Sequence, residues 1–300
     1  MISYFIIAVI IVTVISIVSK VIGKATETPL MKAAAAGDVD SIKELLSEGA
    51  DINEQNSLKN SALSLAIIKN QEEAASVLIN EGANLTMACQ DGKDAFDLVL
   101  ESKNERILLQ LIEKIDTNTL VQLNLLAVVG KNFSVEALRG LFNKIEKEQK
   151  GVLAKIREGN KYSDIDWALW KAAENGNIQN VDFLLEKGAS LTTEPIWAAS
   201  ANGSLPLVKK FIELGDNIEA KDKDGNTCLA IAVINFNNAV AELLLEHNAN
   251  PNIMVVHNGG KYPLMFYAKA EGSLLVPTLE EYGATSKREL WTDEIKNKAK

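Results

Sequence analysis

A segment of helix-forming residues recurs along this chain at a spacing of 33 residues. The first copy, TPLMKAAAAGDVDSIKELLSEGADIN, spans residues 28–53, and the second, SALSLAIIKNQEEAASVLINEGANLT, spans residues 61–86. In both copies the apolar residues fall into two short stretches at helical spacing, and a glycine follows the second stretch. Two helices of this size cannot bury an apolar face alone, so each copy must pack against its neighbours. The repeat therefore predicts a stack of helix pairs.

Further copies of the same pattern fill most of the chain, and with the first two they make about eight helix pairs. Well-formed copies span residues 168–191, 195–218, 226–252 and 262–285, and two degenerate copies span 94–115 and 123–142. The spacing is longest where a charged piece occupies residues 143–164. We interpret this piece as a solvated helical insertion. A protrusion that contacts a partner, or a boundary between two sub-stacks, is the alternative.

The residue types that recur in each copy have local structural reasons. Thr28 can cap a helix through its hydroxyl, and Pro29 suits the first turn, where its missing amide loses no partner. Small residues such as Ala33 allow close packing of neighbouring helices, and Leu45-Leu46 supplies the apolar ridge between successive pairs. Gly49 suits the left-handed turn that ends the second helix.

This pattern resembles the ankyrin repeat, whose motif runs D-G-x-T-P-L-H-x-A-A, then G, then V-x-x-L-L, then G-A-D/N-I-N. The closest matches are residues 28–30 (TPL), 224–229 (DGNTCL) and 49–53 (GADIN). The resemblance covers roughly residues 26–286 and implies an all-α, ankyrin-like α-solenoid of about eight helix-pair repeats. Residues 287–300 would form a C-terminal tail or a capping helix.

The first 24 residues have a different composition. Residues 2–19 carry no charge, and at about 1.5 Å per residue they are nearly long enough to cross a bilayer core. We therefore expect residues 1–24 to be a transmembrane anchor with its juxtamembrane segment. Lys20 and Lys24 follow the span, so the positive-inside tendency places the repeat domain in the cytoplasm as part of a single-pass membrane protein. The alternative is a signal peptide, with export after its cleavage.

The charge and the residue types exclude several functions. The chain has 40 acidic and 31 basic residues and a net charge of −9, which repels phosphate backbones and argues against nucleic-acid binding. Its two histidines, His247 and His257, are too few for a histidine-rich metal site or a hydrolase triad, and no HExxH motif occurs. Cys89 and Cys228 are expected to pack as small residues, although the loop position of Cys89 leaves it open to reaction. We expect no enzyme, no cofactor, no metal and no small-molecule substrate.

The resemblance implies that partners bind on a concave groove and on the tips of the connecting hairpins. Trp170 and Trp197 share the register of the motif histidine, with Trp167 one turn earlier, and core packing is the alternative role for such a stripe. The tips are residues 56–59, 221–226 and 257–261. The predicted partner-binding residues are Trp170, Trp197, Lys32, Leu65, Lys171, Ile231, Phe266, Asp224, Asn226, His257 and Lys261.

These observations predict a protein–protein interaction module, a scaffold or adaptor that its N-terminal helix tethers to a membrane. The partner would be a protein of unknown identity. The alternative is an inhibitor or immunity-type protein that occludes one enzyme or toxin, because an acidic groove suits a basic target. A tethered scaffold would raise the local concentration of whatever it captures.

Overall fold

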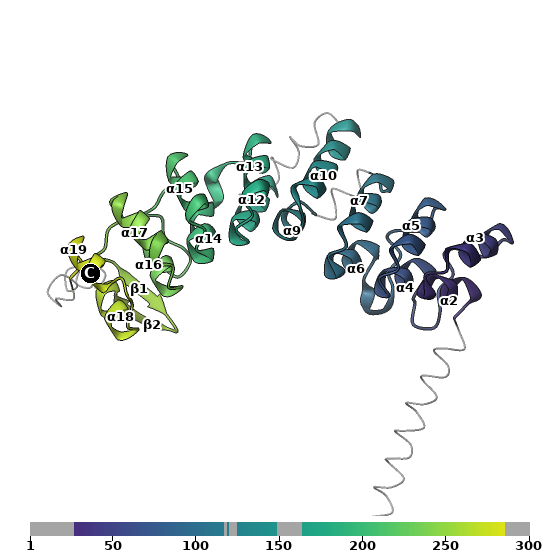
Figure 1. Ribbon diagram of the computed structural model, residues 1–300, viewed down its shortest axis with the longest axis horizontal. Coiled ribbons are helices and arrows are strands. Elements are labelled where there is room, and N and C mark those ends of the chain that lie inside the picture. Colours follow the sequence, from purple (N-terminus) through teal and green to yellow (C-terminus); the bar gives the residue numbers. More distant parts are fainter. Residues whose placement is uncertain (1–26, 117–118, 120–124, 149–163, 286–300) are drawn as a thin grey trace, which may run out of the picture. The chain divides into compact units, whose positions relative to one another are not determined.

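The computed structural model describes residues 27–116, 119, 125–148 and 164–285 (Figure 1). The chain divides into two compact units. Unit 1 comprises Met1–Leu123 and Arg139–Gln149, and unit 2 comprises Asn124–Leu138 and Lys150–Lys300. The two units are described separately.

Each unit is a stack of helix pairs joined by short loops. The described residues of unit 1 contain three complete pairs: α2 (Pro29–Ala36) with α3 (Val39–Ser47), α4 (Ala62–Ile68) with α5 (Glu72–Asn80), and α6 (Ala95–Ser102) with α7 (Glu105–Lys114). Those of unit 2 contain four: α12 (Asp164–Glu174) with α13 (Ile178–Glu186), α14 (Pro195–Asn202) with α15 (Leu205–Glu213), α16 (Cys228–Ile234) with α17 (Asn238–Glu246), and α18 (Leu264–Ala270) with α19 (Val276–Glu281). Two single-turn helices, η1 (Gln90–Gly92) and η2 (Leu191–Thr193), lie in the loops.

One further pair lies at the division between the units. Helix α9 (Leu125–Asn132) belongs to unit 2, and α10 (Val135–Glu148) begins in unit 2 and ends in unit 1. The described residues thus hold eight helix pairs, the number that the repeats predicted. Because α10 continues to Glu148, the first six residues of the predicted insertion 143–164 extend this helix, while residues 149–163 lie outside the described residues.

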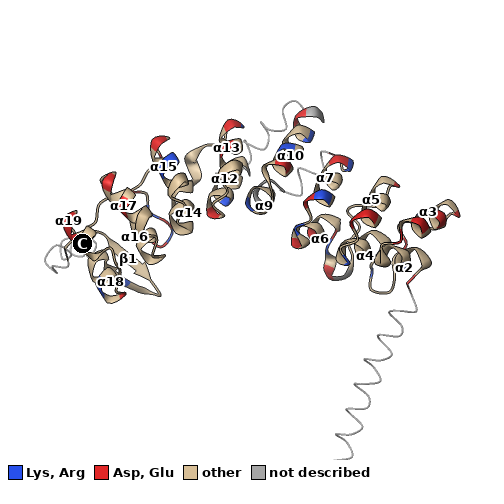
Figure 2. Cartoon of the chain, viewed as in Figure 1, with Lys and Arg blue, Asp and Glu red and all other residues tan. Residues whose placement is uncertain are grey.

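Within each unit, the first helices of several successive pairs pack against one another. In unit 1, α2 contacts α4 and α4 contacts α6; in unit 2, α9 contacts α12, α12 contacts α14, and α14 contacts α16 (Figure 1). Helices α14 and α16 carry no charged residue, whereas their partners α15 and α17 carry lysine or glutamate (Figure 2). In these two pairs the first helix is apolar and the second helix carries the charge. The contacts between the first helices of successive pairs confirm the ankyrin-like stack predicted from the sequence.

The prediction of an all-α fold is wrong in one place. Strands β1 (Met254–His257) and β2 (Gly260–Pro263) form an antiparallel hairpin in which Val255 pairs with Tyr262. The turn between them holds Asn258 at φ 49° and Gly259 at φ 75°, the left-handed pair that a two-residue hairpin turn requires. Two adjacent valines in β1 favour extended backbone. The fold is therefore mostly helical.

The membrane prediction is corrected. In the described part of the chain, no helix is both long enough and apolar enough to cross a bilayer. The single-pass membrane localisation is not supported by this finding, and we withdraw it together with the membrane as a partner. Residues 1–24, on which that prediction rested, and the predicted capping segment 287–300 lie outside the described residues.

Helix starts follow the capping residues of the repeats. Thr28 accepts a hydrogen bond from Met31 N at 3.2 Å ahead of α2, where Pro29 occupies the first turn. Ser61 opens α4 with a reciprocal capping box, in which its hydroxyl accepts from Ser64 N. These caps use amides that a helix start otherwise leaves without partners, so the sequence defines each boundary locally.

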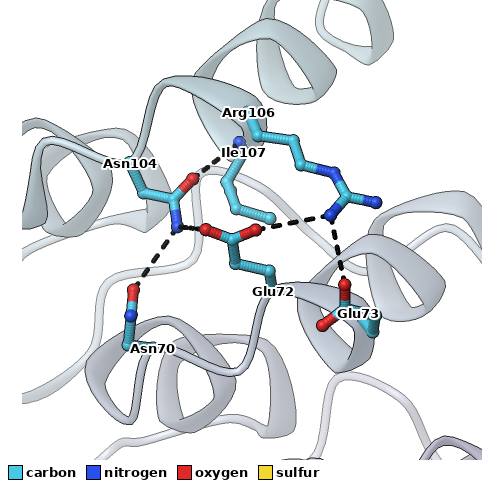
Figure 3. A network of polar contacts seen from close by, with 6 residues as sticks. All are labelled: Asn70, Glu72, Glu73, Asn104, Arg106 and Ile107. Atoms are coloured by element: carbon cyan, nitrogen blue, oxygen red, sulfur yellow. Dashed lines mark hydrogen bonds and ion pairs between the residues drawn. The ribbon is translucent and has the colours of Figure 1, made fainter.

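Polar side chains link successive repeats. Asn104 caps α7 by accepting from Ile107 N at 3.1 Å, and its Nδ2 reaches back to donate to Glu72 Oε1 at 2.7 Å (Figure 3). Arg106 of the same helix lies 3.4 Å from Glu72 and 3.1 Å from Glu73 in α5. One asparagine therefore fixes both a helix start and the position of the preceding repeat.

An equivalent link in unit 2 requires a glycine. Asn237 Nδ2 donates to Ser200 O at 2.9 Å and to Ala201 O at 3.0 Å, two carbonyls in the last turn of α14. Gly203 ends that helix at φ 82°, and a Cβ atom there would lie 2.5 Å from Asn237 Oδ1. Both the left-handed backbone and the close approach of Asn237 disfavour a side chain at this position.

Asp216 gives unit 2 a pH-dependent stability. Burial raises the pKa of Asp216 from 3.8 to about 6, although hydrogen bonds from the backbone N–H groups of Asn217 and Ile196 oppose the rise. Because the folded pKa exceeds the unfolded value, this group contributes its full stability below pH 3.8 and loses it as the pH rises through about 6. Between about pH 4 and 7, the free energy of unfolding of wild type should fall by about 1 kcal/mol relative to that of Asp216→Asn. This value is smaller than the full pKa difference implies, because Asp216 is partly exposed to solvent.

The measurement is urea denaturation of both proteins at each pH. Asp38→Asn serves as the control, because hydrogen bonds from the backbone and hydroxyl of Ser41 lower the pKa of Asp38. As the pH rises, wild type should gain stability relative to Asp38→Asn, whereas it should lose stability relative to Asp216→Asn. A stability difference between wild type and Asp216→Asn that does not change with pH would contradict the prediction.

Candidate partner-binding groove

An open groove of about 750 Å³ lies in unit 2 and extends across three successive repeats. Its walls come from the inner helices α12, α14 and α16, from the tip loop 222–226 and from the β1–β2 turn. In Figure 1 these elements occupy the part of unit 2 between the α12 and β1 labels. The groove is mainly apolar and has carboxylates among its lining residues.

Three tryptophans supply much of its apolar wall. Trp167 and Trp170 stand three residues apart on α12, and their rings stack with centroids 5.0 Å apart and planes at 7°. Trp197 on α14 donates its indole N–H to Ala220 O at 3.1 Å, which fixes its ring toward the following loop. Trp167 is 41% exposed. The tryptophans are therefore held in place by contacts within the chain and still present surface to solvent.

A cluster of charges adjoins the tryptophan pair. Lys171 Nζ lies 5.3 Å from the ring centroid of Trp167 and 4.8 Å from that of Trp170, within cation–π range. The same ammonium lies 3.2 Å from Glu174 Oε2, and Lys131 from α9 lies 2.6 Å from that oxygen. Burial alone would raise the pKa of Glu174, but the hydrogen bonds from both lysines outweigh it and lower the pKa. Glu174 is thus held ionised at the edge of the groove.

Asn226 connects two loops that line the groove. Its Nδ2 donates to Val256 O at 3.0 Å, and its Oδ1 accepts from Val256 N at 2.7 Å. The side-chain amide therefore pairs with the outer edge of β1 much as a neighbouring strand would. Asn226 is 4% exposed, so its role is to join the tip loop to the hairpin.

The tip loop itself is shaped by Asp222. Asp222 Oδ1 accepts from Asp224 N at 2.9 Å and from Asn226 N at 2.8 Å, and Asp222 N donates to Asn226 O. These bonds form a compact turn that leaves Lys223 and Asp224 exposed. The tip thereby carries charged side chains at the rim of the groove.

The structure brings together part of the predicted set. Six of the predicted residues line the groove: Trp170, Trp197, Asp224, Asn226, Ile231 and His257. Lys171 contacts the tryptophan rings as described above. The remaining four lie elsewhere: Lys261 pairs with Val256 from β2, Phe266 stacks on Tyr262, and Lys32 and Leu65 belong to unit 1.

Several lining residues were not among those predicted. They include Trp167, Glu174, Thr193, Ile234 and Val256. Trp167 could have been added from its spacing of three from Trp170, which places both on one helix face. Val256 had no such signal, because its place depends on the hairpin. Thr193 lies in η2, in the connection between α13 and α14.

The two histidines and the two cysteines occupy positions that give them structural roles. His247 is the C-cap residue of α17, and His257 packs edge-to-face on Tyr267 with ring centroids 5.7 Å apart. Burial raises the pKa of both cysteine thiols, and Cys89 is only 3% exposed, which opposes the reactivity its loop position suggested. Within the described ranges, no three His, Cys, Asp or Glu residues gather as a metal site.

Comparison with known proteins gives the family. A family model described as "Ankyrin repeats (3 copies)" matches residues 25–121 and 196–286, more than half of the chain. The rat Ankyrin repeat and SAM domain-containing protein 6 is 38% identical over 74 residues, which are 24% of this chain and 8% of that protein. The Caenorhabditis elegans Ankyrin repeat and KH domain-containing protein mask-1 is 27% identical over 235 residues, 75% of this chain and 8% of that protein.

A third relative matches over a larger share of its own length. The mouse B-cell lymphoma 3 protein homolog is 24% identical over 222 residues, 69% of this chain and 48% of the relative. The chain thus spans less than half the length of these three curated relatives. The sequence period, the stacked helix pairs with their tip loops and the family match agree, and the chain belongs to the ankyrin-repeat family.

Proposed function

We propose that this chain is a protein-binding module without catalytic activity, and that the groove of unit 2 takes a segment of a partner protein as part of a scaffold or adaptor. The observation that carries the proposal is the open groove of about 750 Å³ with three tryptophans on its wall. Tryptophan is enriched among the residues that dominate binding energy at protein interfaces. Family membership supports the proposal because helical repeat stacks bind through extended concave surfaces.

The groove is also preformed, which favours binding. The stacked pair Trp167–Trp170, the hydrogen bond from Trp197 to Ala220 O and the two bonds between Asn226 and Val256 hold three of its walls. A surface that is ordered before binding loses less conformational entropy when a partner arrives. We therefore assign partner recognition to unit 2.

The experiment places a photo-crosslinking amino acid at Lys223 of the full chain, because this exposed residue lines the groove. A matched control carries the same amino acid at Lys43, an exposed position of α3 in unit 1. We expect a discrete crosslinked product at Lys223 that is absent at Lys43. The product should disappear when Trp170→Ala and Trp197→Ala are combined, with helical content measured by circular dichroism to confirm folding.

Two results would overturn the proposal. One is the same set of products from both crosslinking positions, and the other is a product at Lys223 that persists in the folded double variant. Once the partner is identified, its activity separates the two functional classes: a captured partner that keeps its activity fits a scaffold, and one that loses it fits an inhibitor.

A further inference from the structure

The contacts of Lys171 point to the chemical group that the tryptophans of the groove accept. The Lys171 ammonium lies 4.8 Å and 5.3 Å from the ring centroids of Trp170 and Trp167, with the Glu174 carboxylate 3.2 Å away. A cation over an aromatic face beside a carboxylate is the arrangement by which proteins recognise cationic side chains and ligands. In this chain the cation comes from the same helix as the rings.

The rest of the groove has two features that one side-chain type would satisfy together. Its wall is apolar, from the tryptophans together with Ile231 and Ile234, while the tip at its rim presents the carboxylates of Asp222 and Asp224. Arginine has an apolar stem that packs along such a wall and a charged head that pairs with carboxylates. Its planar guanidinium also stacks on indole rings, which the compact lysine ammonium does not do.

We propose that the partner segment carries an arginine, whose side chain lies over the Trp167–Trp170 pair with its guanidinium directed to the rim carboxylates. Lys171 lies over the two rings within the chain and is displaced when the arginine binds. This inference rests on the proposed function and adds the chemistry of the partner to it. A net charge of −9 for the whole chain also favours the approach of a basic segment.

The first test uses the peptide acetyl-Gly-Ser-Arg-Ser-Gly-amide, with citrulline or lysine in place of arginine as matched probes. Citrulline keeps the size and planarity of arginine and lacks its charge. Binding to the full chain is followed by the indole N–H signals of Trp167 and Trp170 in NMR spectra, assigned with Trp167→Phe and Trp170→Phe. We expect the arginine peptide to shift these signals and the citrulline peptide to bind about fivefold or more weakly.

Two pairs of variants locate the site. Lys171→Met should tighten arginine binding by about two- to fivefold, since the resident cation is gone. Lys131→Met also removes one positive charge beside Glu174, but it leaves Lys171 over the tryptophan rings. It should therefore tighten arginine binding less than Lys171→Met does. Asp224→Asn should weaken binding, whereas Asp91→Asn, in the single-turn helix η1 of unit 1, should leave it unchanged.

The outcomes separate this inference from the proposed function. Equal binding of the arginine and citrulline peptides, no shift of either indole signal, or equal effects of Lys171→Met and Lys131→Met would overturn the arginine site. Any of these results, combined with groove-dependent crosslinking at Lys223, would leave protein binding in place with a different anchor. If the arginine peptide binds selectively but crosslinking at Lys223 does not depend on the groove, the arginine site is supported and the proposed protein-binding function is refuted.

Discussion

Replacing Asn226 with alanine is expected to lower the free energy of unfolding by about 2 kcal/mol. The substitution removes both partners of Val256, whose N–H and C=O pair with the Asn226 side chain at 2.7 Å and 3.0 Å. A polar group left without its hydrogen bond in a partly desolvated place costs roughly 1–3 kcal/mol. The measurement is urea denaturation of the full chain followed by circular dichroism.

Asn60 supplies a matched control for that substitution. It closes the tip loop 56–60 of unit 1, where Asn56 N donates to Asn60 O as Asp222 N donates to Asn226 O. Among the described residues, however, the buried Oδ1 atom of Asn60 has no hydrogen-bond partner. Asn60→Ala should therefore cost less than about 0.5 kcal/mol, because no hydrogen bond of Oδ1 is lost. Equal losses for the two variants would show that the link to Val256 adds nothing.

The Asn226→Ala substitution should also affect partner binding. Asn226 joins the tip loop that carries Asp224 to the β1 strand that carries His257, and all three residues line the groove. Without that link the two loops are no longer held together, so the groove loses part of its preformed shape. We expect the crosslink at Lys223 to weaken in Asn226→Ala under conditions where the variant remains folded, because binding must then order the loops.

The helix pairs were predictable from the sequence because their signals are local. Thr28 caps α2 and Ser61 caps α4 through hydrogen bonds that span three residues, and each cap lies directly beside the apolar stretch that it starts. The β-hairpin also had a local signal in Asn258-Gly259, the dipeptide that favours a two-residue hairpin turn. The repeat pattern predicts only helices and connecting loops, so this dipeptide is expected at a loop tip, residues 257–261.

The groove was predictable only in part, because register within a repeat does not say which repeats share a surface. Leu65 and Ile231 occupy the same motif position, yet Leu65 lies in unit 1 and Ile231 lines the groove of unit 2. The position of the Lys171 side chain is set by Glu174 and, through it, by Lys131 from α9. The contact between Lys131 and Glu174 joins residues of different repeats, so no local sequence pattern predicts it.

Replacing Phe211 with alanine should have the largest effect on stability, about 3–5 kcal/mol. Phe211 lies on α15 at 0% exposure and is among the largest fully buried side chains of the chain. Truncation removes its apolar contacts and leaves a cavity that the packed helices can fill only partly. Urea denaturation monitored by tryptophan fluorescence reports directly on this region, since Trp167, Trp170 and Trp197 all belong to unit 2.

Leu214 is the matched control, because it is an apolar residue that caps the same helix and is 52% exposed. Leu214→Ala should change the unfolding free energy by no more than about 0.5 kcal/mol, as is usual for surface positions. Comparable losses from the two variants would contradict the assignment of Phe211 to the core. Because α15 packs against α14, which carries Trp197, the loss of Phe211 should also weaken partner capture at the groove. In a repeat stack the stability of each pair depends on its neighbours, so damage behind the groove reaches the residues that line it.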